Sequence, residues 1–294
     1  MVARAPTLLP SRSRALLREA ATSSPAPAAA PAPALLSGIA ARRRMVGRHL
    51  RRVEGAGLGG RELDRMIEQT FASYARYWAE SLRLPSLSLE KIAAGMRYEG
   101  FEHLERSLAA GGGTIVALPH LGGWEWGGAH LALSGYPMSV VVESLEPREV
   151  FEWFVSFRER LGMHVIPTGP AAAGRSSRVL ADNGILCLLC DRVTAGVSGV
   201  QVEFFGEQTT LPAGPVTLAF RTGATILPAA VYFGRSAREH TGVIRPPVEV
   251  RRTGRLRADV EAGTQALATQ LEALIRRAPT QWHLMQPNWP SDLL

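Results

Sequence analysis

A histidine followed closely by two glycines is the first candidate for chemistry in this sequence. His120 stands directly after the apolar segment 114–119, and Gly122 and Gly123 follow it. Glycines permit a tight turn and the close approach of a ligand to the backbone, and a neutral imidazole in such a turn can act as a general base. The same position also suits a histidine that only caps the end of a strand. The spacing leaves both interpretations open.

Glu125 lies five residues after His120. In a continuous helix this offset is roughly 140° around the axis, so the two side chains would diverge. They converge only if His120 occupies the turn and Glu125 the first turn of a helix, where the carboxylate would fix the imidazole tautomer and stabilise the imidazolium. Alternatively, Glu125 is simply a favourable negative charge at a helix N-terminus.

Other catalytic patterns fit the sequence less well. His120, Glu125 and His130 are spaced five and five rather than in the H-E-x-x-H pattern, so we expect no metal site. No G-x-S-x-G elbow and no G-x-x-x-x-G-K-[ST] phosphate loop occur. Cys187 and Cys190 form a C-x-x-C pair inside an apolar run of strand length. We therefore expect two buried apolar side chains rather than a redox pair.

The charge of the chain is concentrated at its N-terminal end. The 294 residues are 46% hydrophobic, enough for one large core or two smaller ones, and the formal net charge is +7. Residues 1–60 hold ten arginines and two glutamates, a net charge of +8, so the remainder is nearly neutral. Such a basic arm favours a polyanion, either an anionic bilayer or nucleic acid. No recognised nucleic-acid module surrounds the arginines, so we expect no nucleic-acid partner.

The composition also predicts where the folded part begins. Residues 20–37 are rich in alanine and proline, so we predict a flexible basic arm over residues 1–38 and a single folded domain over residues 39–294. No run reaches the roughly 20 apolar residues that span a bilayer, and residues 1–10 lack a signal-peptide pattern. Any membrane contact is therefore expected to be peripheral. Two cysteines give no disulfide framework, which favours a reducing compartment.

The elements that must position these residues alternate along the chain. Strands that alternate with helices of ten or more residues predict an α/β fold with a largely parallel sheet. In such sheets the site lies at the carboxyl ends of the strands, and His120, Glu143 and Asp191 each lie at or just past such an end. The predicted strands are 114–119, 137–143, 163–167, 185–190, 200–205, 224–233 and an edge strand 243–251, and the predicted helices are 60–84, 124–133, 147–161, 175–183, 214–222 and 259–277.

A series of short motifs makes the chain recognisable. The H-x-x-x-x-E motif from His120 to Glu125 resembles the HtrB-like lysophospholipid and lipid A acyltransferase superfamily. Within it the match is closer to the actinobacterial phosphatidylinositol mannoside acyltransferases. The resemblance covers about residues 45–290 and rests on segments in the family's order, namely 73–78, 118–120, 157–162, 199–207, 211–215 and 282–287.

The resemblance implies three catalytic residues. His120 would be the base that deprotonates a sugar hydroxyl. Asp191, the acidic residue before an arginine after the central strand, would form a relay with that histidine. The family's pattern has glutamate there, which is one methylene longer. Glu125 would support the histidine or the substrate.

The resemblance also implies a binding groove. The family's fold is an α/β sandwich with a hydrophobic groove for the acyl chain, which here predicts a single αβα sandwich over residues 39–294. Glu143 and Arg158 would line the polar end of the groove, and Arg192 would meet a donor phosphate or the reaction's oxyanion. Backbone N–H groups near Gly122 and Gly123 are the other candidates for the oxyanion.

The resemblance thus predicts an acyltransferase that moves a long-chain acyl group, palmitoyl, from acyl-CoA to a mannose hydroxyl of a phosphatidylinositol mannoside. It needs no cofactor beyond acyl-CoA as substrate and no metal. Its predicted partners are acyl-CoA, a membrane glycolipid acceptor and the anionic inner-membrane surface, at the cytoplasmic face of the cell membrane. The alternatives are the same chemistry on another glycolipid or a lysophospholipid, or a non-catalytic membrane lipid-binding protein.

Overall fold

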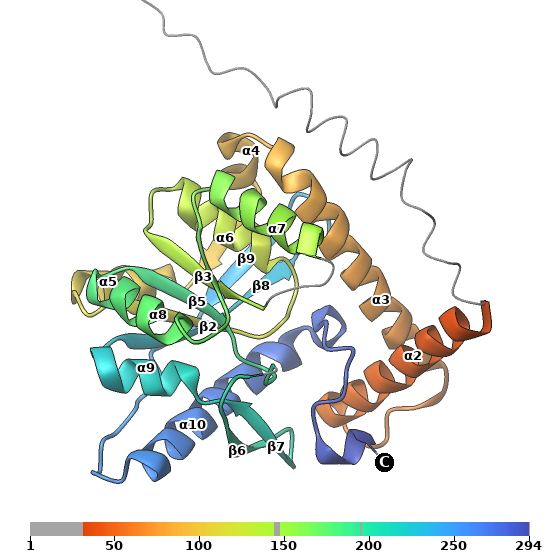
Figure 1. Cartoon of the computed structure of the whole chain (residues 1–294). Coiled ribbons are helices and arrows are strands. Elements are labelled where there is room, and N and C mark those ends of the chain that lie inside the picture. Colours follow the sequence, from red (N-terminus) through yellow and green to blue (C-terminus); the bar gives the residue numbers. More distant parts are fainter. Residues whose placement is uncertain (1–31, 144–147, 195, 294) are drawn as a thin grey trace, which may run out of the picture. The chain divides into compact units, whose positions relative to one another are not determined.

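The computed structural model describes residues 32–143, 148–194 and 196–293, shown in Figure 1. The chain divides into two units, residues 1–44 and residues 45–294. The described part of the first unit belongs to helix α2, Ala32–Glu54, which continues into the second unit. The predicted boundary at residue 38 falls inside this helix. Residues 1–31 of the predicted arm lie outside the described residues.

The second unit is built on a seven-stranded sheet with the order β1-β9-β8-β2-β5-β3-β4. Every neighbouring pair is parallel except β8 and β9, so the predicted α/β fold with a largely parallel sheet is confirmed. Strand β2 lies at the centre and is buried along its whole length. The strands are β1 Met96–Glu99, β2 Thr114–Leu118, β3 Met138–Val142, β4 His164–Pro167, β5 Ile185–Leu189, β8 Thr225–Phe233 and β9 His240–Ile244.

Helices cover both faces of this sheet, and alternate strand residues supply a separate core on each face. On what we call the near face, the core includes residues of α4 (Leu89–Ala94), α5 (Phe101–Ala109), α6 (Trp124–Leu133) and α7 (Arg148–Arg160). On the far face it includes residues of α8 (Ala172–Ala181), α9 (Gly214–Thr222) and α10 (Leu256–Arg277). Cys187 belongs to the near core and Cys190 to the far core, both as buried free thiols, as predicted.

Helix α3, Gly60–Arg83, runs as the sequence predicted. Its apolar residues form a third small core with the part of α2 that lies in the second unit, through Val46, Leu50, Leu63, Met66 and Ile67. The remaining helical turns are short 3-10 helices at Leu84–Ser86, Pro279–Gln281 and Pro290–Leu293.

Two predicted strands differ from the structure. The strand predicted at 200–205 is β6, Gly199–Phe204, which pairs with β7, Glu207–Pro212, in a separate antiparallel hairpin. Phe205 and Gly206 turn this hairpin with positive φ, as a tight hairpin turn requires. The edge strand predicted at 243–251 is wrong, because the strand is β9 and ends at Ile244. Pro246 and Pro247 follow it, and proline donates no ladder hydrogen bond.

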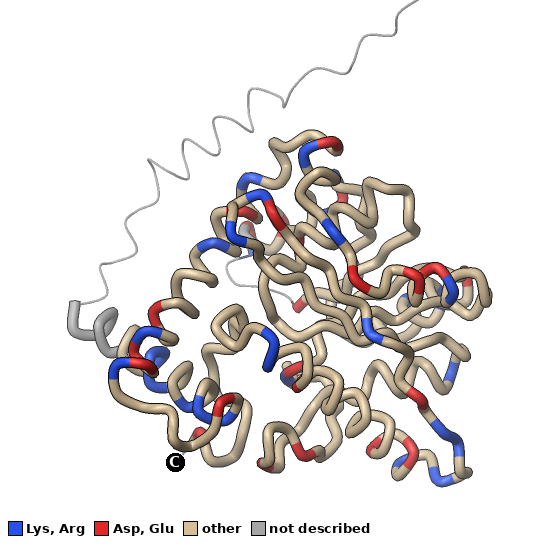
Figure 2. The backbone as a smooth tube through the Cα atoms, turned by 180° about the vertical axis from the view of Figure 1, so that it is seen from behind, with Lys and Arg blue, Asp and Glu red and all other residues tan. Residues whose placement is uncertain are grey.

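Acidic and basic residues lie along all parts of the described chain (Figure 2). Of the ten arginines counted in residues 1–60, six lie on α2 and four lie outside the described residues. Among the described helices, none combines the length and the apolar character that crossing a membrane requires.

Candidate active site

His120 lies in a turn that other segments of the chain hold in place. Its backbone oxygen accepts the N–H of His283 at 2.7 Å, and Leu121 forms an isolated antiparallel bridge with Trp282. Gly122 has φ of +62°, and a Cβ atom there would lie 2.0 Å from the backbone oxygen of Val231. The turn therefore needs glycine at position 122, because only glycine tolerates both the dihedral and the approach.

The backbone N–H groups of this turn are already used. Gly122 donates to the backbone oxygen of Gln281 and Gly123 to that of Val231, each at 2.9 Å. These two groups are therefore not left to receive a developing oxyanion, and the role predicted for N–H groups near them stays a prediction for the other groups at the start of α6. The glycines instead fix the turn between the C-terminal segment and strand β8.

His120 and Asp191 are joined by two hydrogen bonds. Strands β2 and β5 are neighbours, and the two residues follow their carboxyl ends. Nδ1 of His120 lies 2.6 Å from Oδ1 of Asp191, and the backbone N–H of His120 donates to Oδ2 at 3.0 Å. Because a carboxylate only accepts, Nδ1 carries the hydrogen in the neutral imidazole. Nε2 is then the basic nitrogen, and it has no hydrogen-bond partner among the described residues.

Asp191 is itself held from the C-terminal segment. Its side chain is 0% exposed. The indole N–H of Trp282 donates to Oδ2 at 2.7 Å, and the amide of Asn288 donates to its backbone oxygen at 3.0 Å. Burial raises the pKa of Asp191, but the charge of His120 and the hydrogen bonds from His120 and Trp282 bring this pKa below its ordinary value. Asp191 is therefore an ionised, fixed partner for the imidazole.

Glu125 does not contact His120 in the way that the predicted convergence requires. Its two carboxylate oxygens accept from the guanidinium of Arg158 on α7, and Tyr77 donates to it at 3.3 Å. Burial lowers the pKa of Arg158. The charge of Glu125 and its hydrogen bonds raise this pKa by more, so the pKa of Arg158 lies above its ordinary value. Glu125 thus neutralises a buried arginine. Its predicted support of the substrate stays a prediction.

Glu143 and Arg192 form a second ion pair nearer to solvent. Nη2 of Arg192 lies 2.9 Å from Oε2 of Glu143, and both side chains are partly exposed. With its amide oxygen turned toward Arg192, Gln286 accepts from the same guanidinium at 3.0 and 3.2 Å. Glu143 follows the carboxyl end of β3, and Arg192 directly follows Asp191 after β5, so both groups lie at the edge of the sheet where His120 lies.

A cavity of about 700 Å³ joins these groups. His120, Glu125, Glu143, Arg158 and Arg192 all line it, and Asp191 lies buried behind His120. The rest of the lining is mainly apolar and includes side chains from β2, β3, β5, α6 and α9. The structure thus brings the six residues singled out in the sequence to one region, at the carboxyl ends of the strands. Among the described residues, no group of three or more His, Cys, Asp or Glu side chains is placed to hold a metal ion.

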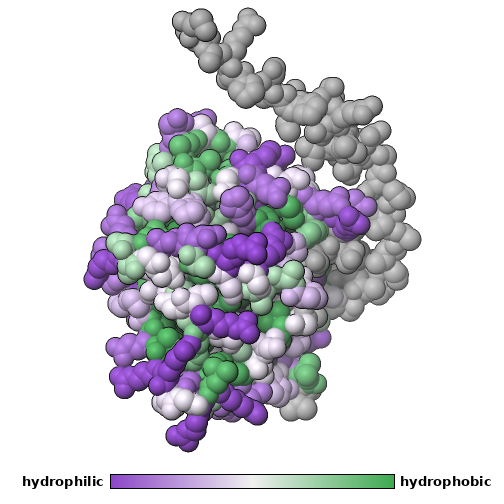
Figure 3. Space-filling model, turned by 60° about the vertical axis from the view of Figure 1, so that its left-hand side comes forward, coloured by the Kyte–Doolittle hydropathy of each residue, from purple (hydrophilic) through white to green (hydrophobic). Residues whose placement is uncertain are grey.

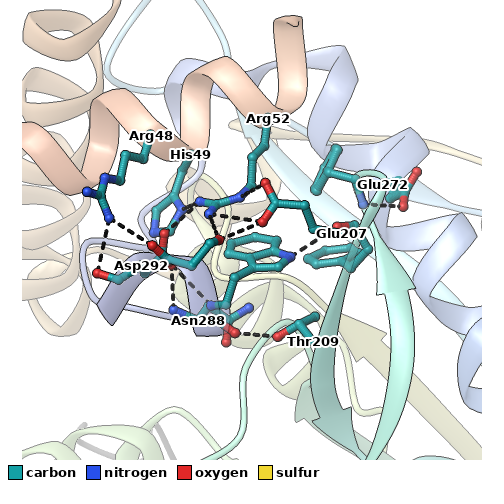
Figure 4. A network of polar contacts seen from close by, with 12 residues as sticks. Arg48, His49, Arg52, Glu207, Thr209, Glu272, Asn288 and Asp292 are labelled. Atoms are coloured by element: carbon teal, nitrogen blue, oxygen red, sulfur yellow. Dashed lines mark hydrogen bonds and ion pairs between the residues drawn. The ribbon is translucent and has the colours of Figure 1, made fainter. Parts of the chain in front are cut away.

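The sequence did not reveal what holds the C-terminal segment against this site. Arg52 on α2 pairs with Glu207 at 2.9 Å and with Asp292 at 2.8 Å (Figure 4), and its guanidinium lies 4.3 Å from the ring centroid of Trp289. Asp292 in turn accepts the backbone N–H of Asn288 at 2.9 Å. This network fixes the segment that delivers Trp282 and Asn288 to Asp191. Its members are far apart in sequence, and only the C-terminal motif 282–287 gave a hint of it.

Known proteins are similar in sequence to this chain over most of its length. The family model described as bacterial lipid A biosynthesis acyltransferase matches residues 38–291. A phosphatidylinositol mannoside acyltransferase of Mycolicibacterium smegmatis is 39% identical over 237 residues, which are 78% of this chain and 74% of that protein. A phosphatidylinositol mannoside acyltransferase of Mycobacterium tuberculosis is 36% identical over 236 residues, 78% of this chain and 72% of that protein. The chain therefore belongs to the bacterial lipid A biosynthesis acyltransferase family.

Proposed function

We propose that this protein transfers a long-chain acyl group, palmitoyl, from a thioester donor such as acyl-CoA to a mannose hydroxyl of a phosphatidylinositol mannoside. The names of two relatives that match three quarters of this chain support the acceptor. The observation that carries the chemistry is the His120–Asp191 pair at the wall of a large apolar cavity.

The reaction proceeds by general-base catalysis. Nε2 of His120 takes the proton of the attacking hydroxyl as its oxygen forms a bond to the thioester carbonyl carbon. The tetrahedral intermediate then collapses, the carbon–sulfur bond breaks, and the imidazolium returns its proton to the departing thiolate. Asp191 stabilises the transient imidazolium through Nδ1, and a base of this kind contributes roughly 10²–10⁴-fold to the rate.

The developing oxyanion needs donors other than Gly122 and Gly123. The guanidinium of Arg192 lines the cavity and is one candidate. The first N–H groups of α6, at Trp124 and Glu125, are another, because the first turn of a helix has no intrahelical acceptors. Hydrogen-bond donors that point at such an oxygen contribute a large part of the rate enhancement in acyl transfer.

The apolar part of the cavity is the proposed binding site for a long acyl chain. On the near face it is lined by side chains such as Val116, Leu118, Leu131, Met138 and Met163. Each methylene that leaves water for such a lining contributes about 0.8 kcal/mol. A long chain is therefore bound far more strongly than a short one.

The protein works as a peripheral protein on the cytoplasmic face of the cell membrane, against the anionic inner leaflet. The arginines of α2 and of residues 1–31 support this placement, because anionic lipids attract basic segments at roughly 1 kcal/mol per residue.

The test is transfer of labelled palmitate from palmitoyl-CoA to purified phosphatidylinositol mannosides, with product analysis. Wild-type protein should acylate a mannose hydroxyl, His120→Ala should not, and His164→Ala, an exposed histidine at the start of β4, should match wild type. If the protein acylated only a lysophospholipid or another glycolipid, that lipid would be the acceptor and the assignment to phosphatidylinositol mannoside would be wrong. If the protein bound lipid but transferred no acyl group, it would be a non-catalytic lipid-binding protein.

A further inference from the structure

The two carboxylate oxygens of Asp191 accept hydrogen bonds from different groups. Oδ1 faces Nδ1 of His120 at 2.6 Å. Oδ2 accepts the backbone N–H of His120 at 3.0 Å and the indole N–H of Trp282 at 2.7 Å. Within the described part of the chain, Trp282 is therefore the one side chain besides His120 that hydrogen-bonds this carboxylate.

Trp282 itself is held in a fixed position. Its side chain is buried, and its backbone forms an isolated antiparallel bridge with Leu121. Its ring centroid lies 5.6 Å from that of His49 and 5.7 Å from that of Phe205. The indole N–H thus points at Asp191 before any substrate binds.

The carboxylate of Asp191 divides its negative charge between the imidazole and the indole. No water competes for it, because the side chain is 0% exposed. Hydrogen bonds to an ionised group are roughly twice as strong as those between neutral groups, and a donor on a carboxylate stabilises its charge. A donor on Oδ2 therefore leaves less negative charge to stabilise a proton on His120.

Three other titratable groups interact electrostatically with Asp191. Burial lowers the pKa of His49 to about 4 and that of His283 to about 3. Burial also raises the pKa of the Cys190 thiol above its ordinary value. All three groups consequently stay neutral between about pH 5 and 8, so none of them can imitate a change in the charge of His120 over this range.

The permanent charges near the pair are constant as well. Arg192 follows Asp191 in the chain and pairs with Glu143 at 2.9 Å, and Arg158 pairs with Glu125. An arginine keeps its charge throughout this pH range. Figure 3 shows hydrophilic side chains over much of the face that carries α8 and α9, but water and salt screen charges on an outer surface. The hydrogen bonds of Asp191 are thus the local feature that a substitution can change selectively.

We propose that Trp282 is a positioning residue that acts through Asp191, and that its indole N–H sets the pH above which His120 is a neutral base. Without this N–H, more of the carboxylate charge acts on the imidazole, which favours the imidazolium. The neutral base then forms only at higher pH. The proposal rests on the proposed function, in which His120 takes a proton from the acceptor hydroxyl.

Trp289 distinguishes this role from a purely structural one. It belongs to the same C-terminal segment and is equally buried. Its indole N–H donates to the backbone oxygen of Phe204 at 3.1 Å rather than to Asp191. Loss of either indole N–H removes one hydrogen bond from the segment, but only the loss at Trp282 changes the carboxylate that faces His120.

The test is an NMR titration of the full chain labelled with ¹⁵N-histidine, with the signals of His120 identified by their absence in His120→Gln. Trp282→Phe and Trp289→Phe are compared with wild type. In a second pair of variants benzothienylalanine replaces the same tryptophans, which keeps the ring size but puts sulfur in place of the N–H. This pair tests the proposal even if phenylalanine unfolds the segment, and thermal unfolding checks each variant. No substrate is needed, so the result does not depend on acyl transfer.

Both replacements of Trp282 should raise the titration midpoint of His120 by about 0.5–1 pH unit, a three- to tenfold change in proton affinity. The acid limb of the transfer rate should move by the same amount, with KM little changed. Both replacements of Trp289 should leave the midpoint in place. An unchanged or lowered midpoint in the Trp282 variants, or an equal rise in the Trp289 variants, would overturn the proposal. Failure of the proposed function would instead appear as wild-type protein that transfers no acyl group while the titration shift persists.

Discussion

Asp191 holds His120 at two atoms, with Oδ1 2.6 Å from the imidazole Nδ1 and Oδ2 3.0 Å from the backbone nitrogen. The first contact selects the tautomer whose Nε2 is basic. The second fixes the backbone of the turn to the same carboxylate, so that His120 begins from a defined position beside Asp191. Asp191 is in turn fixed by Trp282, which makes the C-terminal segment a structural part of the site.

Asp191→Asn should reduce kcat by about 100-fold or more, because the imidazolium loses its charge partner and the amide can select the wrong tautomer. KM for both substrates should change little, since Asp191 is buried behind His120. Asp182→Asn, at the exposed C-terminal end of α8, is the control for loss of one carboxylate. Steady-state kinetics of labelled acyl transfer check this, and a variant within threefold of wild type would refute the pairing.

Glu125→Gln should act mainly on stability. It leaves Arg158 buried without its charge partner, and breaking a buried pair in this way costs roughly 3–5 kcal/mol. The double variant Glu125→Gln with Arg158→Met should recover much of that loss, because no charge is then buried. Urea unfolding measures both. A Glu125→Gln protein as stable as wild type would show that the pair contributes nothing to the fold.

The free energy of unfolding should fall as pH drops below about 6.5. Burial lowers the pKa of His49 to about 4, while hydrogen bonding to Gln286 partly opposes it. The folded protein therefore binds fewer protons than the unfolded chain between these values, so stability is lost with falling pH, at up to about 1.4 kcal/mol per pH unit. His283, with a burial-lowered pKa of about 3, acts in the same direction.

Denaturant unfolding between pH 4 and 8 tests this dependence on His49. His49→Gln removes one titrating group and should flatten the slope, whereas replacement of the exposed His164 should not. An unchanged slope in His49→Gln would contradict the assignment.

Gly122→Ala should destabilise the protein much more than Gly135→Ala. Both glycines have positive φ, +62° and +87°, so both substitutions carry the left-handed backbone cost. A Cβ at position 122 would also meet the backbone oxygen of Val231, whereas position 135 has open space. We expect roughly 1 kcal/mol for Gly135→Ala and about 3 kcal/mol or more for Gly122→Ala. Similar melting temperatures for the two variants would show that the turn relaxes.

Much of the fold followed from local patterns. The run Thr114–Pro119 predicted a buried strand and a turn at His120, since apolar residues, proline and glycine act locally. Strand β1 was not predicted, because Met96–Glu99 holds no apolar run, whereas the equally short β4 contains Val165 and Ile166. The edge strand was extended too far past Ile244 because apolar residues continue beyond Pro246 and Pro247.

The contacts of the site were less predictable than its members. The partner of Glu125 depends on where α7 places Arg158, and no spacing near Glu125 encodes that. The anchoring of Asp191 by Trp282 joins residues 91 positions apart. The likeness to a family indicated that Asp191 would pair with the histidine, whereas only the structure shows that Glu125 pairs with Arg158 instead.

The most direct test of the central claim is the rate of acyl transfer by His120→Gln, measured at saturating donor and acceptor beside wild type and His164→Gln. Glutamine keeps a polar side chain of similar size but cannot take a proton from the hydroxyl. The account predicts a fall in kcat of at least about 100-fold with an unchanged melting temperature. Transfer within threefold of wild type would contradict His120 as the base.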